Sequence, residues 1–268
     1  MRRFELSAPA SSLVSWMVMI LCLAAGAAPA SAQDTAIIPA GDPVQTLSRA
    51  NDAYAASDFP TAIAGYRALL DSGHDHPLVH YDLGNAYLRQ GELGRAIASY
   101  RRAAAGAPRD QDVSANLAYA RKSARDAVTP PEPPMVWRTV FAWHYALSRS
   151  ELWTAIVVLN TLLWALLALR LWRRSEALTW AAVVIAVLLA AGVTSLAFHE
   201  LYATRVAVVL PREIDARAAN QADSVVRFKL HAGSEVLVRG ESGGWLRIVL
   251  PSGEQGWIEA EQAEVVEL

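Results

Sequence analysis

Two long stretches without a charged residue constrain this chain more than any other feature of its sequence. The first runs from Leu152 to Leu169 and the second from Leu178 to Phe198. A helix needs about 20 apolar residues to cross the hydrocarbon core of a bilayer. With flanking residues included, each stretch is long enough, so we expect transmembrane helices at residues 151–172 and 178–198. Neither stretch holds an ionisable residue, which indicates an anchor rather than an ion or proton path.

The short segment between the two stretches is basic. It contains Arg170, Arg173 and Arg174. An arginine at the bilayer centre costs about 2.5–3.5 kcal/mol on insertion scales, so these side chains must lie at a membrane face. Because basic loops favour the cytoplasm, the regions before and after the pair of spans are expected outside it. Ser148 and Glu151 form a capping-box pattern that predicts the start of the first span.

The first 32 residues have the order of a secretory signal peptide. Arg2 and Arg3 precede an apolar run from Leu13 to Gly26, and Ala30-Ser31-Ala32 supplies small residues for cleavage. The alternatives are a transmembrane anchor and a lipoprotein anchored at Cys22, although Leu21 is larger than the residue expected before a lipidated cysteine. Export of the next region agrees with the orientation predicted from the arginines. Cleavage after Ala32 would leave no cysteine, since the chain has one.

Composition and motifs narrow the chemistry. The net charge of −2 argues against nucleic acid as a partner, because neutralising many phosphates needs a basic surplus. No grouping of histidine, aspartate and serine has the context of a hydrolase, so we expect no enzyme, no catalytic residue and no cofactor. His76 and His80 are spaced like metal ligands on a helix. Pro77 starts the helix only after His76, however, so we expect no metal site there.

A repeat with a period of 34 residues precedes the apolar stretches. Residues 62–66 read Ala-Ile-Ala-Gly-Tyr and residues 96–100 read Ala-Ile-Ala-Ser-Tyr. The second copy also has Leu83, Gly84, Tyr87 and Ala103 at matching positions, and Pro108 ends it. This pattern resembles the tetratricopeptide repeat family, in which small residues let two helices approach and aromatic residues fill the gaps between hairpins. We expect repeats at 43–76 and 77–110 and a polar capping helix, within residues 43–127.

The resemblance implies a peptide-binding or protein-binding groove lined by the first helix of each repeat. The candidate groove residues are Asn51, Tyr54, Tyr81, Asn85 and Arg89. Asn51 and Asn85 occupy the same repeat position, where an amide could donate to and accept from a peptide backbone. The alternative is that both amides bond within their own helix pair. The region lacks groove lysines, so recognition of a terminal carboxylate is not expected.

Residues 128–150 form a predicted linker and an aromatic segment. Thr129 to Pro134 is rich in proline and is expected to be extended. The aromatic residues that follow, in a stretch poor in charge, are Trp137, Phe141, Trp143 and Tyr145. Such rings favour the headgroup region, which predicts a short helix lying at the membrane surface. The alternative is that the rings pack beneath the repeats.

The last part of the chain is rich in short β-type segments with turns between them. We expect strands at 205–210, 225–230, 235–238, 245–250 and 256–258. Leu230-x-x-Gly233, Gly244-Trp245 and Gly256-Trp257 resemble the bacterial SH3-like family over residues 203–268. The resemblance implies a small all-β SH3-like barrel that binds peptides or cell-wall components. Trp245, beside a glycine-rich turn, is the candidate binding residue.

The predicted fold class is multidomain, with all-α tetratricopeptide repeat hairpins, two transmembrane helices and the small barrel. This order resembles the aerotolerance-operon (BatE-type) family of bacterial membrane proteins; the residues that carry the likeness include Leu83 to Tyr87 and Asn116 to Ala118. The resemblance implies von Willebrand factor A-type membrane proteins and a cytosolic MoxR-type ATPase as associates. We expect an inner-membrane scaffold with repeats and barrel in the periplasm and the short hairpin in the cytoplasm. The alternative is a cell-wall sensor that binds peptidoglycan peptides.

Overall fold

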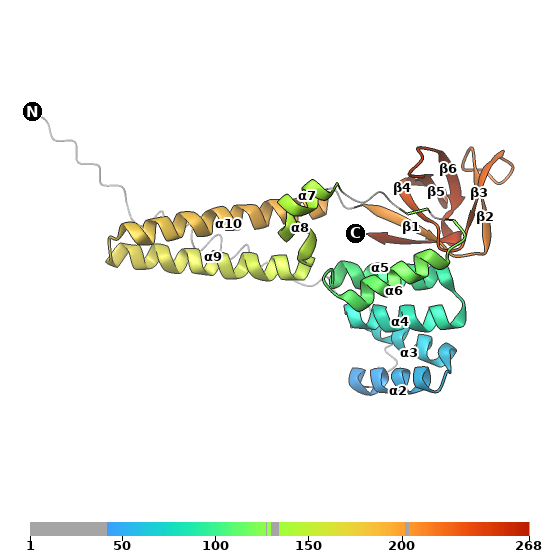
Figure 1. Cartoon of the computed structure of the whole chain (residues 1–268), viewed down its shortest axis with the longest axis horizontal. Helices are drawn as coiled ribbons and strands as arrows, with labels where there is room; N and C mark the ends of the chain where they lie inside the picture. The colour runs from blue at the N-terminus through green and yellow to red at the C-terminus, as the bar shows by residue number, and fades with distance from the viewer. Residues whose placement is uncertain (1–41, 127, 130–133, 202–203, 268) are drawn as a thin grey trace, which may run out of the picture. The chain divides into compact units, whose positions relative to one another are not determined.

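The computed structural model describes residues 42–126, 128–129, 134–201 and 204–267 (Figure 1). The predicted signal peptide, residues 1–32, lies outside the described residues, as does most of the proline-rich linker. The helices, strands and contacts of the structure are those of these residues.

Five helices form the repeat region: α2 (Pro43–Ala55), α3 (Phe59–Asp71), α4 (Pro77–Gln90), α5 (Leu93–Gly106) and α6 (Gln111–Ser123). Local sequence accounts for their starts. Asp58 and Asp110 accept backbone N–H groups at the first turns of α3 and α6, and His76 does so for α4. Gly91 ends α4 in the left-handed conformation. The two hairpins and the single helix after them confirm the predicted repeat helices.

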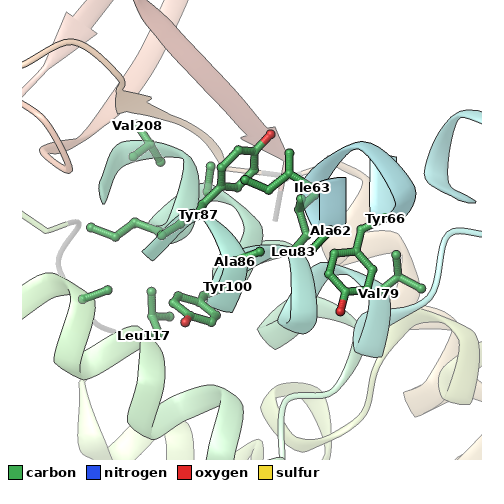
Figure 2. Close-up of a cluster of buried hydrophobic side chains, with 14 of the residues drawn as sticks. Ala62, Ile63, Tyr66, Val79, Leu83, Ala86, Tyr87, Tyr100, Leu117 and Val208 are labelled. Atoms are coloured by element: carbon green, nitrogen blue, oxygen red, sulfur yellow. The ribbon is translucent and has the colours of Figure 1, made fainter. Parts of the chain in front are cut away.

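Small residues bring the helices of each hairpin together. A Cβ added to Gly84 would lie 2.7 Å from the ring of Tyr100, and one added to Gly65 would lie 2.8 Å from the Cβ of Ala50. Tyr66 and Tyr100, at the same repeat position on the second helices, are buried in the resulting core (Figure 2). The contacts therefore follow the division between small and aromatic positions that the repeat pattern predicts.

Two long apolar helices follow, α9 (Arg149–Trp172) and α10 (Glu176–Leu201). They lie side by side as a hairpin (Figure 1), with Gly192 of α10 against Ile156 of α9. Most of their apolar side chains remain exposed. By length and composition, both helices could cross a membrane. The predicted capping box is confirmed, because Ser148 Oγ accepts the Glu151 N–H and the Glu151 carboxylate accepts the Ser148 N–H.

The aromatic segment folds into two short helices, α7 (Met135–Val140) and α8 (Ala142–Ala146). Trp137 stacks on Phe141, with ring centroids 5.6 Å apart, and Trp143 meets the same ring edge-on. These three rings are between 37% and 53% exposed. The rings therefore contact one another and remain partly exposed to solvent, while the position of this segment at a membrane surface stays a prediction.

Seven strands form one antiparallel sheet. They are β1 (Arg205–Val209), β2 (Glu213–Arg217), β3 (Val226–His231), β4 (Glu235–Ser242), β5 (Trp245–Val249), β6 (Gln255–Glu259) and β7 (Ala263–Glu267). Five match predicted strands; β2 and β7 were missed because each has few large apolar residues. The strand order is β3-β2-β6-β5-β4-β1-β7. β3 and β7 are edges in the described residues, so the prediction of a closed barrel is wrong.

The repeats supply a reason for the open sheet. Val208 of β1 is buried in the same cluster as the repeat core (Figure 2). Val266 of β7 and Ile97 of α5 belong to this cluster too. Gly94 of α5 approaches so closely that an added Cβ would overlap the Val209 carbonyl oxygen. The edge strand β7 and its neighbour β1 therefore bury their apolar side chains against α5. Because the helix covers these side chains, the sheet does not need to close on itself to bury them.

An ionic network joins the same two parts. Glu235 of β4 is fully buried and accepts hydrogen bonds from Arg101 of α5 and from Arg121 of α6. Asp126, just after α6, accepts the backbone N–H of His231 at 2.8 Å and the hydroxyl of Ser234 at 2.9 Å. These hydrogen bonds hold the pKa of Asp126 below its usual value, against the opposing effect of burial. The network lies between α5, α6 and the start of β4.

Candidate functional site

The first helices of the two repeats and the capping helix α6 carry side chains at corresponding repeat positions, which we name the first-helix face. Residues at helical spacings of three and four share one side of each helix. The members of this face are Val44, Leu47 and Asn51 of α2, Leu78, Tyr81, Asp82 and Asn85 of α4, and Asn116 and Tyr119 of α6. Val44, Leu78 and Tyr119 are more than half exposed, at 72%, 51% and 63%. The face therefore combines accessible apolar groups with amides and with the Asp82 carboxylate, and the exposed Asp112 of α6 lies at the same repeat position as Leu78.

The two candidate asparagines take part in a hydrogen bond that recurs in both repeats. The hydroxyl of Tyr66 donates to Asn51 Oδ1 at 2.8 Å, and the hydroxyl of Tyr100 donates to Asn85 Oδ1 at 2.7 Å. Each bond joins residues 15 positions apart. Burial raises the pKa of both tyrosines above the usual value, which keeps the hydroxyls protonated as donors.

A third amide extends this arrangement to the capping helix. Asn116 Nδ2 donates to Asn85 Oδ1 at 2.9 Å and to the hydroxyl of Tyr81 at 3.1 Å. Asn85 therefore accepts two bonds through one oxygen, while Tyr81 belongs to the same network. The structure thus has hydrogen bonds within the repeats at both asparagines, as the alternative in the sequence analysis describes. Because the Oδ1 atoms of both asparagines already accept hydrogen bonds, the groups left for a ligand are the side-chain N–H groups. The Asn51 side chain is exposed to solvent.

Tyr54 and Arg89 come together around a residue that the sequence analysis missed. The rings of Tyr54 and Phe59 meet edge-on with centroids 5.7 Å apart, and the Arg89 guanidinium lies 5.5 Å from the centroid of the Phe59 ring. Arg89 is therefore held by a cation–π contact between repeats and is exposed to solvent. The signal that could have found Phe59 is its place as an aromatic residue directly after the helix-capping Asp58.

Asp82 is the second residue that sequence reasoning missed. It follows Tyr81 on α4 and is half-buried, and burial raises its pKa to about 6. The pKa of Tyr66 on α3 is raised mainly by burial and secondly by the negative charge of Asp82, so the two groups are neighbours. A carboxylate at a first-helix position that faces the neighbouring repeat was the available signal.

Trp245 lies in a different place, on the sheet. It is half-buried and lines a pocket of about 310 Å³. The other residues around this pocket are Glu213, Ile214, Asp215, Arg217, Lys229, Glu259 and Gln262. Trp245 is paired in register with Glu259 across β5 and β6. The structure therefore does not bring Trp245 together with the five candidate residues of the repeats, and it surrounds the indole with charges of both signs.

Residues 240–244 read Gly-Glu-Ser-Gly-Gly, a G-x-S-x-G pattern that the expectation of no hydrolase overlooked. In α/β-hydrolases this motif places the serine in a sharp turn between a strand and a helix. Here Ser242 ends β4 and the glycines form the hairpin to β5, so the structural context of a nucleophile is missing. The motif therefore does not support catalysis.

The histidines near α4 have structural partners. His76 Nδ1 accepts the Leu78 N–H and caps the helix, and His80 Nε2 lies 2.7 Å from Asp75 Oδ1. Burial lowers the pKa of His80, against the effect of Asp75. Within the described residues, histidine, cysteine, aspartate and glutamate side chains form no group of three that could hold a metal ion.

Comparison with known proteins identifies one part of the chain. Residues 47–111 match the tetratricopeptide repeat family. The match covers α3, α4, α5 and most of α2. A search of the curated proteins found no match to the sequence. The repeats are therefore tetratricopeptide repeats, which serve protein interaction and are generally not catalytic.

Proposed function

We propose that this protein is a non-enzymatic membrane scaffold whose first-helix face binds an extended segment of a partner protein. The observation that carries the proposal is the tetratricopeptide match over residues 47–111, which include the α4 part of this face and Leu47 and Asn51 of α2. Exposed Val44, Leu78 and Tyr119 supply apolar contacts, and the N–H groups of Asn51 and Asn85 can donate to backbone carbonyls of the partner. Because Tyr66 and Tyr100 hold the two amides in place, binding would lose little side-chain entropy there.

The proposed location is the bacterial inner membrane, with α9 and α10 as two spans. Arg170, Arg173 and Arg174 lie at or next to the turn between these helices, which supports a cytoplasmic hairpin. The repeats and the C-terminal sheet would then face the periplasm. Both lie in one chain beside the anchor, so a partner that touches both would experience a raised effective concentration. The resemblance of the domain order to the aerotolerance-operon family suggests von Willebrand factor A-type membrane proteins as partners.

Site-specific photocrosslinking tests the scaffold function. A benzophenone side chain is placed in the full chain at Leu78 or Tyr119 of the first-helix face, and at exposed Arg67 of α3 as the control. We expect a discrete crosslinked product in membranes from the two face positions and none from position 67. Mass spectrometry of the product identifies the partner. Equal labelling at all three positions, or labelling at none, contradicts the proposal.

A second candidate function is attachment to the cell wall through the C-terminal sheet. The pocket at Trp245 favours it, because an indole beside carboxylates, cations and an amide can bind a polar peptide. The SH3-like resemblance of residues 203–268 points to peptidoglycan peptides.

Sedimentation with purified sacculi tests this second candidate. If the sheet binds the wall, full-length protein in detergent is expected to sediment with sacculi, and Trp245→Ala is expected to reduce the bound fraction at least tenfold. The control is Tyr119→Ala, which changes an exposed aromatic residue on the repeats. If the wild type and both variants sediment equally, any wall binding does not depend on Trp245. If none of the three proteins sediments with sacculi, attachment to the cell wall is excluded as the function of the sheet.

A further inference from the structure

The carboxylate of Asp82 is half-buried among the repeat helices, and within residues 42–126 the repeats place no cationic side chain in an ion pair with it. No lysine or arginine in the described part of the chain forms an ion pair with it, although ten other pairs involve these residue types. Its pKa is raised by burial to about 6, so the group is mostly ionised at pH 7.5. A half-buried anion in this state is unfavourable for the folded chain and available to a ligand.

The surroundings of Asp82 define what a ligand would meet. Leu78 lies one turn before it on α4 and is 51% exposed, and Asn85 lies one turn after it. Tyr66, which donates to Asn51, is the titratable neighbour on α3. The carboxylate thus lies between accessible Leu78 and the anchored amide of Asn85, on the face already proposed to bind a protein segment.

We propose that Asp82 makes the first-helix face selective for an extended segment that carries a lysine or arginine, with apolar residues beside it. This inference rests on the proposed function of the face. The bound cation would form a charge-assisted hydrogen bond with the carboxylate, and neighbouring apolar residues would cover Leu78. A segment with an acidic residue or a terminal carboxylate at this point would be repelled. The partner is therefore a basic, partly apolar stretch of another protein.

Substitution of Asp82 separates a binding role from a folding role. The folded-state pKa of about 6 lies above the reference value of 3.8, so ionisation disfavours the folded state. The penalty is complete above pH 6 and absent below the reference pKa. Asp82→Asn is thus expected to raise the melting temperature at pH 8, with the gain disappearing near pH 4. If Asp82 instead stabilised the folded state, Asp82→Asn would lower the melting temperature at pH 8.

A peptide selection tests the charge preference directly. Full-length protein in lipid nanodiscs is used to select from a phage library of random 12-residue peptides. We expect the wild type to enrich peptides with lysine or arginine among apolar residues, and Asp82→Lys to enrich peptides with aspartate or glutamate. Asp82→Asn is expected to bind a selected basic peptide about tenfold or more weakly than the wild type. The matched control is Asp52→Asn, which removes an exposed carboxylate from α2 and should leave selection unchanged.

The outcomes distinguish this inference from the function on which it rests. If the wild type and Asp82→Lys enrich peptides of the same charge, the inference is overturned while peptide binding stands. If the wild type enriches nothing beyond empty nanodiscs, the proposed function falls together with the inference. A peptide that binds Asp82→Asn as tightly as the wild type also overturns the role of the carboxylate.

Discussion

Replacement of Glu235 by alanine is expected to lower the free energy of unfolding by about 3–5 kcal/mol, the usual cost of removing one partner from a buried ionic network. The Glu235 side chain is fully buried and bonds to Arg101 and Arg121. Burial is the main cause that lowers the pKa of Arg101, and Arg121 lowers it further, while Glu235 opposes both. Without the carboxylate, two guanidinium groups would remain beside each other, one of them buried.

The matched control is Glu241→Ala on the same strand. Glu241 pairs with Arg205 at 3.4 Å, and both side chains are exposed, so the expected cost is below about 1 kcal/mol. The measurement is urea unfolding of the full-length protein in detergent, followed by tryptophan fluorescence. Similar midpoints for the two variants would contradict a structural role for the network between α5, α6 and β4.

Tyr100→Ala is the second substitution with a large expected effect. The side chain is fully buried between the helices of the second hairpin, against Gly84, and its hydroxyl donates to Asn85. Removal of a large buried aromatic side chain costs about 3–5 kcal/mol through lost transfer energy and the cavity that remains. We expect the same loss here, measured by circular dichroism during thermal unfolding of the full chain.

Two further variants separate packing from hydrogen bonding at this position. Tyr100→Phe keeps the ring and removes the donor to Asn85, so about 1 kcal/mol is expected. Tyr119→Ala removes an exposed ring from α6 and should change stability by less than about 0.5 kcal/mol. If Tyr100→Ala is no more destabilising than Tyr100→Phe, then the ring does not form the core of the hairpin.

Much of the fold was predictable where a pattern is local or repeats. The 34-residue period, together with Pro77 at a helix start, predicted helices that the structure and the family match confirm. The uncharged stretches predicted α9 and α10, and Ser148 with Glu151 predicted the cap between α8 and α9. Each signal depends on spacings of a few residues or on an exact repetition, so a single sequence contains it.

The candidate site was predictable only in part. Repeat numbering placed Asn51, Tyr81 and Asn85 on one face, but it could not say that tyrosines 15 residues later engage the two asparagines. Phe59 and Asp82 were missed because neither matches a repeat position with a fixed residue type.

The sequence by itself determined the repeat helices, the two apolar helices and most of the strands, because these depend on local periodicity and on residue type. Only the tertiary structure decided that the sheet stays open, since Val208, Val266 and Gly94 reveal that α5 covers its edge. Only the tertiary structure also showed that Glu235 meets Arg101, 134 residues away in the chain. Contacts over such separations depend on how whole elements pack, and no short pattern encodes them.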